Sequence, residues 1–167
     1  MPAHITIDIL KEAILLERRG QAFYRKIAEQ STNPVIKEFF DTMAGEEARH
    51  IEILESQFAA YVQNQQFEPL SSKDRESQPA AQLVLTDALK KQIAAADFEA
   101  AAISAAMLME ERAISLYSQR ATTAQDPAEE TLYLWLAGWE RGHLSDLAQL
   151  DRQIKESIWN DRQFWPF

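Results

Sequence analysis

Two Glu-x-x-His motifs stand out in the sequence, and each begins 30 residues after another glutamate. The six residues concerned are Glu17, Glu47, His50, Glu110, Glu140 and His143. On an α-helix, the Glu and the His of such a motif lie one turn apart on the same face, so both side chains can converge on one point. Four carboxylates and two imidazoles gathered in this way would bind two divalent cations, and they suit iron, manganese or zinc better than calcium or magnesium.

The six residues fall within apolar stripes of helical periodicity, which predicts that they point into a protein core. Burying an unpaired carboxylate is costly, and four buried carboxylates close together would also repel one another. Two divalent cations would balance the four negative charges, so the pattern favours a site for two metal ions. The alternative is a helical bundle in which these polar residues satisfy one another without a metal.

The chain repeats itself when it is shifted by 93 residues, and the repeat needs no gap. The recurring pairs include Ala13/Ala106, Glu17/Glu110, Arg19/Arg112, Tyr24/Tyr117, Pro34/Pro127, Gly45/Gly138, Glu47/Glu140, His50/His143 and Leu54/Leu147. We therefore expect two copies of one helical hairpin, packed face to face with approximate twofold symmetry. The predicted fold class is an all-α four-helix bundle.

Four long segments have the periodicity of amphipathic helices: residues 7–29, 34–64, 95–121 and 127–158. Asn33-Pro34 and Asp126-Pro127 are typical helix starts, with proline in the first turn. The short connections at 30–33 and 122–126 predict helical hairpins. Residues 65–82 contain two prolines and a cluster of charges, which indicates either a crossover between the hairpins or a flexible surface stretch. A shorter helix is expected near residues 83–92. All of this fits a single domain over residues 1–167, with repeats at 7–64 and 95–158.

Tyr24 and Tyr117 stand seven residues after Glu17 and Glu110, two turns along the same helix face. We expect each hydroxyl to hold a ligand carboxylate by a hydrogen bond or to donate an electron locally; the alternative is an ordinary core tyrosine.

Two further features concern the surroundings of the site. Gly45 and Gly138 cost helix stability, and their recurrence suggests a close approach of helices beside the site. Trp139 breaks the repeat, because the matching residue is Glu46, so one side of the site is expected to be bulkier.

Composition excludes several classes of protein. The chain has no cysteine, so disulfides, thiolate-bound zinc, iron–sulfur clusters and rubredoxin-type iron sites are ruled out. A net charge of −9 argues against a nucleic-acid partner. The sequence also lacks an apolar run of membrane-spanning length and the pattern of a secretory signal at its start. We therefore expect no membrane association and a cytoplasmic location.

The paired Glu and Glu-x-x-His motifs resemble those of the ferritin-like diiron-carboxylate superfamily, particularly its rubrerythrin and bacterioferritin branches. The resemblance covers roughly residues 7–150. It implies that Glu17 and Glu110 are terminal ligands, that Glu47 and Glu140 bridge two iron ions, and that His50 and His143 each bind one ion. Manganese or zinc are possible substitutes.

The chain also departs from these relatives. Rubrerythrins carry an additional glutamate three residues after the ligand of the third helix, where this sequence has Ala113. They usually carry a rubredoxin domain as well, whose four cysteines are absent here. Cage-forming ferritins have a fifth helix, for which little chain remains after residue 158, and no methionine can be assigned as a haem ligand.

The resemblance implies a diiron oxidoreductase that reduces hydrogen peroxide or O2, by peroxidase or ferroxidase chemistry, with an external electron donor. One alternative is an iron-binding module that stores or delivers the metal without multiple turnovers, and another is an oxygenase acting on an organic substrate. The aromatic tail, residues 159–167, is expected to pack on the bundle or in a homodimer, with peptide docking as the alternative.

Overall fold

The computed structural model describes residues 3–76 and 97–160, and within these ranges every regular element is an α-helix. Four long helices make up the fold: α1 (Ala3–Gln30), α2 (Pro34–Asn64), α5 (Asp97–Thr123) and α6 (Pro127–Asn160). A short helix, α3 (Ser72–Glu76), follows α2. The all-α prediction is confirmed. The helix expected near 83–92 and most of the aromatic tail lie outside the described residues.

The two proline-containing helix starts form as their sequences predict. The Asn33 side chain accepts hydrogen bonds from the backbone N–H groups of Val35 and Ile36, which caps the free donors at the start of α2. Asp126 likewise accepts from the backbone N–H of Ala128 at the start of α6. At the end of α2, Gln65 takes a left-handed conformation, with φ 54°, and its N–H bonds to a carbonyl of the last turn.

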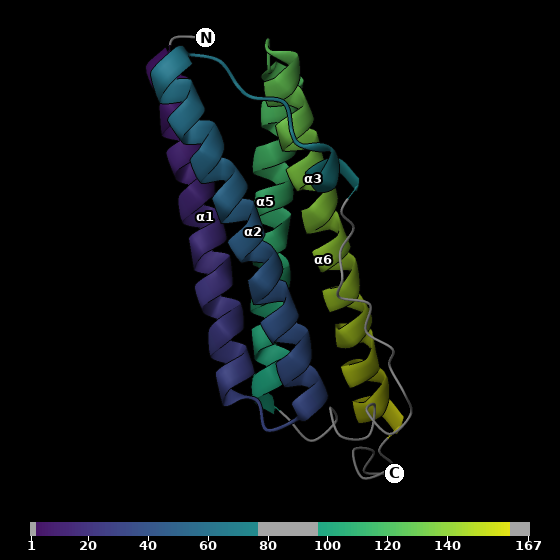
Figure 1. Ribbon diagram of the computed structural model, residues 1–167. Helices are drawn as coiled ribbons and strands as arrows, with labels where there is room; N and C mark the ends of the chain where they lie inside the picture. The colour runs from purple at the N-terminus through teal and green to yellow at the C-terminus, as the bar shows by residue number, and fades with distance from the viewer. Residues whose placement is uncertain (1–2, 77–96, 161–167) are drawn as a thin grey trace.

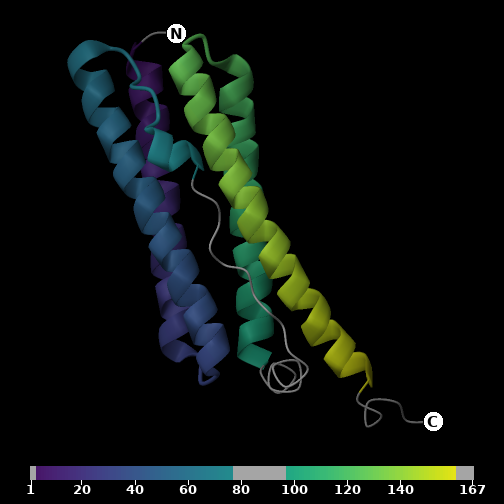
Figure 2. The same ribbon diagram turned by 45° about the vertical axis from the view of Figure 1, so that its right-hand side comes forward.

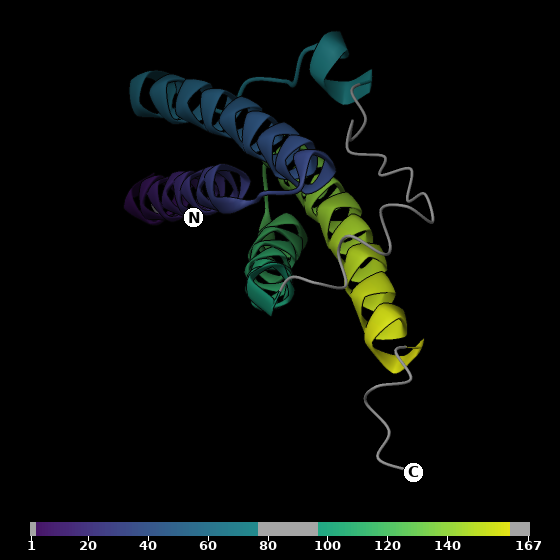
Figure 3. The same ribbon diagram turned by 90° about the horizontal axis from the view of Figure 1, so that it is seen from below.

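The long helices pair as two antiparallel hairpins, α1 with α2 and α5 with α6 (Figure 1). Seen end-on, the four helices surround a common centre, and α1 also packs against α5 (Figure 3). Helix α2 ends at one end of the bundle and α5 begins at the other (Figure 1). No helix within the described ranges is both long and apolar enough to cross a membrane.

The core has two apolar clusters, one towards each end of the bundle. One cluster includes Tyr24, Phe40, Met43, Ile103 and Leu147, and the other includes Leu10, Leu54, Tyr117, Leu132 and Leu136. On each long helix, the residues between the two clusters include the buried glutamates and histidines. A polar layer therefore lies between two apolar layers.

Helix α3 lies beside α2 and α6 (Figure 2). The Asp74 carboxylate accepts hydrogen bonds from the Arg49 guanidinium on α2 and from the Ser71 hydroxyl. The Trp135 indole N–H on α6 donates to the Asp74 carbonyl over 2.9 Å. These contacts hold α3 against both hairpins. The sequence did not predict this short helix.

Asp74→Asn is expected to lower the free energy of unfolding at pH 7 by about 1–2 kcal/mol, since it weakens hydrogen bonds to a charged group. Burial alone would raise the pKa of Asp74, but Ser71 and Arg49 lower it below its usual 3.8. A carboxyl group with a lowered pKa stabilises the fold above its unfolded-state pKa, and this stabilisation is lost as the pH falls through the folded-state pKa. Denaturant unfolding of the metal-free protein should therefore show the full difference at pH 7 and a smaller one at about pH 3. An equal difference at both pH values would contradict this account.

Candidate metal centre

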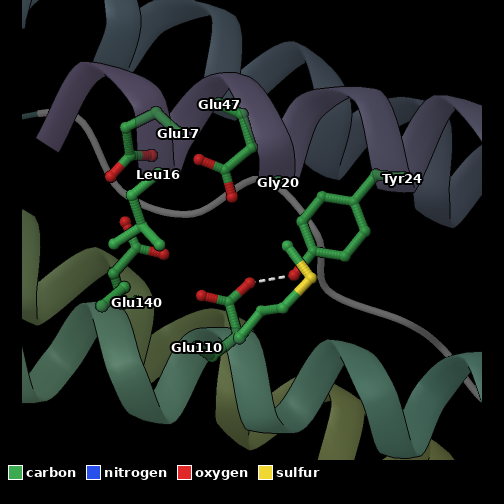
Figure 4. A pocket seen from close by; sticks show the side chains of 9 residues that line it. Leu16, Glu17, Gly20, Tyr24, Glu47, Glu110 and Glu140 are labelled. Carbon is green, nitrogen blue, oxygen red and sulfur yellow. Dashed lines mark hydrogen bonds between the residues drawn. The ribbon is translucent and has the colours of Figure 1, made fainter. Parts of the chain in front are cut away.

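The six residues singled out by the sequence meet at the middle of the bundle, and none is more than 3% exposed. Helix α1 contributes Glu17 and α5 contributes Glu110. Helices α2 and α6 each contribute a Glu-x-x-His motif, whose two side chains lie one turn apart on the inward face. The carboxylates of both hairpins point towards a shared space (Figure 4).

The six residues form two groups that each offer four ligand atoms within 4.8 Å of one another. The first group is Glu17, Glu47, His50 and Glu140, and the second is Glu47, Glu110, Glu140 and His143. Glu47 and Glu140 belong to both groups. Two metal ions held here would therefore share two carboxylates, and each would have one carboxylate and one imidazole of its own.

Both histidines turn Nδ1 towards the carboxylates. The Nδ1 atom of His50 lies 3.2 Å from Glu17, 3.3 Å from Glu47 and 3.2 Å from Glu140. The Nδ1 atom of His143 lies 3.2 Å from Glu140, and the other carboxylates of its group lie 3.5 and 3.6 Å away. Nδ1 is thus the nitrogen placed to bind a metal, and Nε2 points away from the cluster.

Protonation compensates the charges of the metal-free cluster. Burial and the charges of Glu47 and Glu140 raise the pKa of Glu17 well above 4.5, and burial with Glu140 does the same for Glu110. Burial and the charge of Glu140 would also raise the pKa of Glu47, but close contacts with Glu17 and the two imidazoles lower it to about 2. Burial would likewise raise the pKa of Glu140, but close contacts with both imidazoles lower it.

The pKa values of both imidazoles are raised. Burial would lower the pKa of His50 and of His143, but contacts with the surrounding carboxylates raise both well above 6.5. The raised pKa values thus favour two imidazolium ions and two carboxylic acids, and the lowered ones favour two carboxylates between them. Within the described residues, Glu47 Oε2, Glu140 Oε1 and His143 Nδ1 are nevertheless buried without a hydrogen-bond partner. Buried polar atoms of this kind are normally satisfied, and a divalent cation would satisfy all three, so the residues fit a metal.

Each of the two tyrosines bonds to the opposite hairpin. The Tyr24 hydroxyl donates to Glu110, and the Tyr117 hydroxyl donates to Glu17. Burial and the nearby carboxylates raise the pKa of both tyrosines, so both hydroxyls stay protonated and remain donors. Glu110 and Glu17 each belong to only one of the two ligand groups. Each tyrosine thereby holds a carboxylate that the two groups do not share.

A sequence model of the rubrerythrin family matches residues 8–151, which cover most of both hairpins and all six clustered residues. This chain belongs to the rubrerythrin family. No curated protein and no solved structure gives a significant match. The family match confirms the resemblance and the ferritin-like bundle predicted from the sequence.

A small cavity in this rubrerythrin-family bundle opens between α1 and α5 beside the carboxylates (Figure 4). Its walls include Leu16, Gly20, Met109 and Ala113, together with Tyr24 and all four glutamates. The space open to the centre of a water molecule is about 10 Å³, enough for about one molecule of that size. Ala113 is the position at which other rubrerythrins are expected to carry an additional glutamate, so its small side chain helps to form this space.

Gly45 and Gly138 do not have the role proposed for them. A Cβ atom at either position would meet nothing within 4 Å, so no helix approaches closely there. The glycine beside the cluster is instead Gly20, whose added Cβ would lie 3.5 Å from the Glu47 carboxyl. Gly20 and Ala113 occupy matching positions of the 93-residue repeat, and both side chains are small. This match could have indicated from the sequence that Gly20 lies beside the cluster.

Proposed function

We propose that this chain is a non-haem diiron oxidoreductase that reduces hydrogen peroxide or O2. The observation that carries the proposal is the sharing of Glu47 and Glu140 between two four-residue groups. Shared carboxylates would hold the two ions close together, as a two-electron reaction requires. His50 and Glu17 would complete one iron position, and His143 and Glu110 the other.

Two ferrous ions would supply one electron each, and two electrons with two protons convert hydrogen peroxide into two molecules of water. The protein's own residues hold the carboxylates in position, keep bulk water from the site and admit a small oxidant. Tyr24 and Tyr117 hold the terminal carboxylates, while the apolar clusters on either side keep bulk water from the site. The cavity between α1 and α5 admits a molecule of the size of O2 or peroxide.

The size of this cavity also bears on the alternatives. A space for about one water molecule does not accommodate an organic substrate next to the carboxylates, which argues against an oxygenase. A module that takes up and delivers iron would need the same ligands, so it stays the second candidate. Repeated turnover of the oxidoreductase would require an external electron donor. We also propose that the chain acts as a homodimer.

Rapid mixing of the anaerobic diferrous protein with hydrogen peroxide, and separately with O2, tests the proposal. We expect the iron absorbance to change within seconds with at least one oxidant, and comparison of the two rates identifies the preferred one. If neither oxidant changes the iron spectrum on this timescale, the oxidoreductase proposal fails and the uptake and delivery function is favoured.

Gly20→Ala is expected to slow this oxidation by on the order of tenfold, because its methyl group would occupy part of the cavity, in van der Waals contact with the Glu47 carboxyl. The matched control is Gly45→Ala, which adds the same methyl group to a helix but in open space. Both variants should gain up to about 1 kcal/mol in the stability of the metal-free protein, because alanine favours helix more than glycine does. Equal oxidation rates for the two variants would contradict the role assigned to the cavity.

A further inference from the structure

The repeat fails at one pair of positions that touches the metal centre. Position 46 on α2 is glutamate, and its partner on α6, position 139, is tryptophan. Each lies immediately before the glutamate of a Glu-x-x-His motif. The ligands of the two halves match, whereas the residues that contact the two imidazoles from behind do not.

On the side of His143, the imidazole has a carboxylate behind it. The Nε2 atom of His143 lies 2.8 Å from Glu46 Oε2 across the interface between α2 and α6. Its Nδ1 atom faces the glutamates of the cluster. Because the two nitrogens lie on opposite sides of the ring, the bond to Glu46 leaves Nδ1 aimed at the metal position.

On the side of His50, the corresponding place is aromatic. The rings of Trp135 and Trp139 stand nearly perpendicular to the His50 ring, with centroids 5.5 and 5.3 Å away. Within the described residues, His50 Nε2 is buried without a hydrogen-bond partner. The tryptophans shield this imidazole but give its outer nitrogen no acceptor.

A carboxylate that accepts from the outer nitrogen of a metal-bound histidine fixes the ring and makes the inner nitrogen a stronger donor. Loss of such a partner typically weakens metal binding about 10- to 100-fold. The carboxylate of Glu46 also adds negative charge beside the His143 imidazole, whereas the matching residue on α6, Trp139, is uncharged. Both effects act in the same direction.

We infer that the two metal positions are unequal, with the position bounded by His143 binding a divalent cation more tightly than the position bounded by His50, and that Glu46 is the positioning residue responsible. The inference rests on the proposed metal centre. It assigns an order to the filling of that centre: the first ion enters the group that contains Glu110 and His143, and the second enters the group that contains Glu17 and His50.

Titration of the metal-free protein with Co²⁺, in competition with a chelator and without oxygen, measures the two steps. We expect two dissociation constants separated by about 10- to 100-fold. Diffraction at the cobalt absorption edge from crystals holding one equivalent should place the stronger peak beside Glu110 and His143. Two equal constants with equal occupancy, or a stronger peak beside Glu17 and His50, would overturn the inference while leaving the metal centre intact. A protein that binds no Co²⁺ would overturn the centre itself.

The variant Glu46→Ala should weaken the tight step about 10- to 100-fold and bring the two constants together. Glu46→Gln retains an acceptor for His143 without the charge, so it should restore part of the difference. The matched control is Glu38→Ala, which removes an exposed acid from the same helix. Far-ultraviolet circular dichroism of each metal-free variant verifies the fold. If Glu46→Ala keeps its helix content and binds in the same two steps as the unaltered protein, Glu46 does not position His143 and the inference is wrong.

Discussion

Binding of two divalent ions by the metal-free protein at pH 7 is expected to release about four protons. The raised pKa values of Glu17, Glu110, His50 and His143 favour the protonated form of each group in the metal-free cluster. A metal requires carboxylate and neutral imidazole, so each of the four groups must lose its proton on binding. The net charge of the buried layer then changes little, because four protons leave as two divalent ions enter.

The sign of the pH dependence follows from this exchange. Acidic solution favours the protonated, metal-free cluster, so the affinity falls as the pH falls. With four protons released, the product of the two binding constants should decrease by up to about 10⁴ from pH 7 to pH 6. Calorimetric titration with Zn²⁺ in buffers of different ionisation enthalpy counts the protons directly. Release of one proton or none would show that the metal-free cluster is not charged in the way the pKa shifts indicate.

Removal of a shared carboxylate is expected to eliminate both bound ions. Glu47 and Glu140 belong to both ligand groups, so Glu140→Gln leaves each group one carboxylate short. Glu17→Gln is the contrasting variant, because Glu17 belongs to only one group. We expect about two ions per chain for the unaltered protein, about one for Glu17→Gln and close to none for Glu140→Gln.

The gain in thermal stability on adding metal should also be largest for the unaltered protein, smaller for Glu17→Gln and smallest for Glu140→Gln. An ion present at 1,000 times its dissociation constant stabilises the folded state by about 4 kcal/mol. For a chain of this size, each 1 kcal/mol raises the Tm by about 2–4 °C, so two ions should raise it by roughly 15–30 °C. Calorimetric scans with and without Zn²⁺, together with elemental analysis, give both quantities. Equal losses of metal in Glu17→Gln and Glu140→Gln would show that Glu140 is not shared.

The convergence of the six clustered residues could be predicted because it depends on local geometry. Helical periodicity places Glu47 and His50 on one face, and the repeat places Glu140 and His143 on the equivalent face. An apolar stripe interrupted only by such residues predicts a buried polar layer. These steps require no knowledge of how the two hairpins pack.

The contacts between hairpins could not be predicted in this way. Tyr24 follows Glu17 on the same helix face, yet its hydroxyl bonds to Glu110 of the other hairpin. Spacing along one helix identifies a residue that faces the core but not the partner it meets there. The same limit applies to Glu46. From the sequence, its mismatch with Trp139 indicated only a difference in side-chain bulk. Its contact with His143 arises from the packing of α2 against α6.

The short helix α3 was missed for a different reason. Five residues are too few for periodicity to be recognised, and an isolated helix of that length is not stable in water. Contacts with α2 and α6 hold it in place instead, through the hydrogen bonds of Asp74 to Arg49 and Trp135. Interactions of this kind depend on residues 25 and 61 positions away along the chain, which local patterns do not reveal.

The most direct test of the proposed centre is an anomalous-scattering map from crystals loaded anaerobically with excess Fe²⁺ and measured at the iron absorption edge. We expect two peaks in the middle of the bundle, one among Glu17, His50 and the shared glutamates and the other among Glu110, His143 and the same glutamates. Glu47 and Glu140 should contact both peaks. A map in which this polar layer holds no iron, or holds a single ion that Glu47 and Glu140 do not share with a second, would contradict the account.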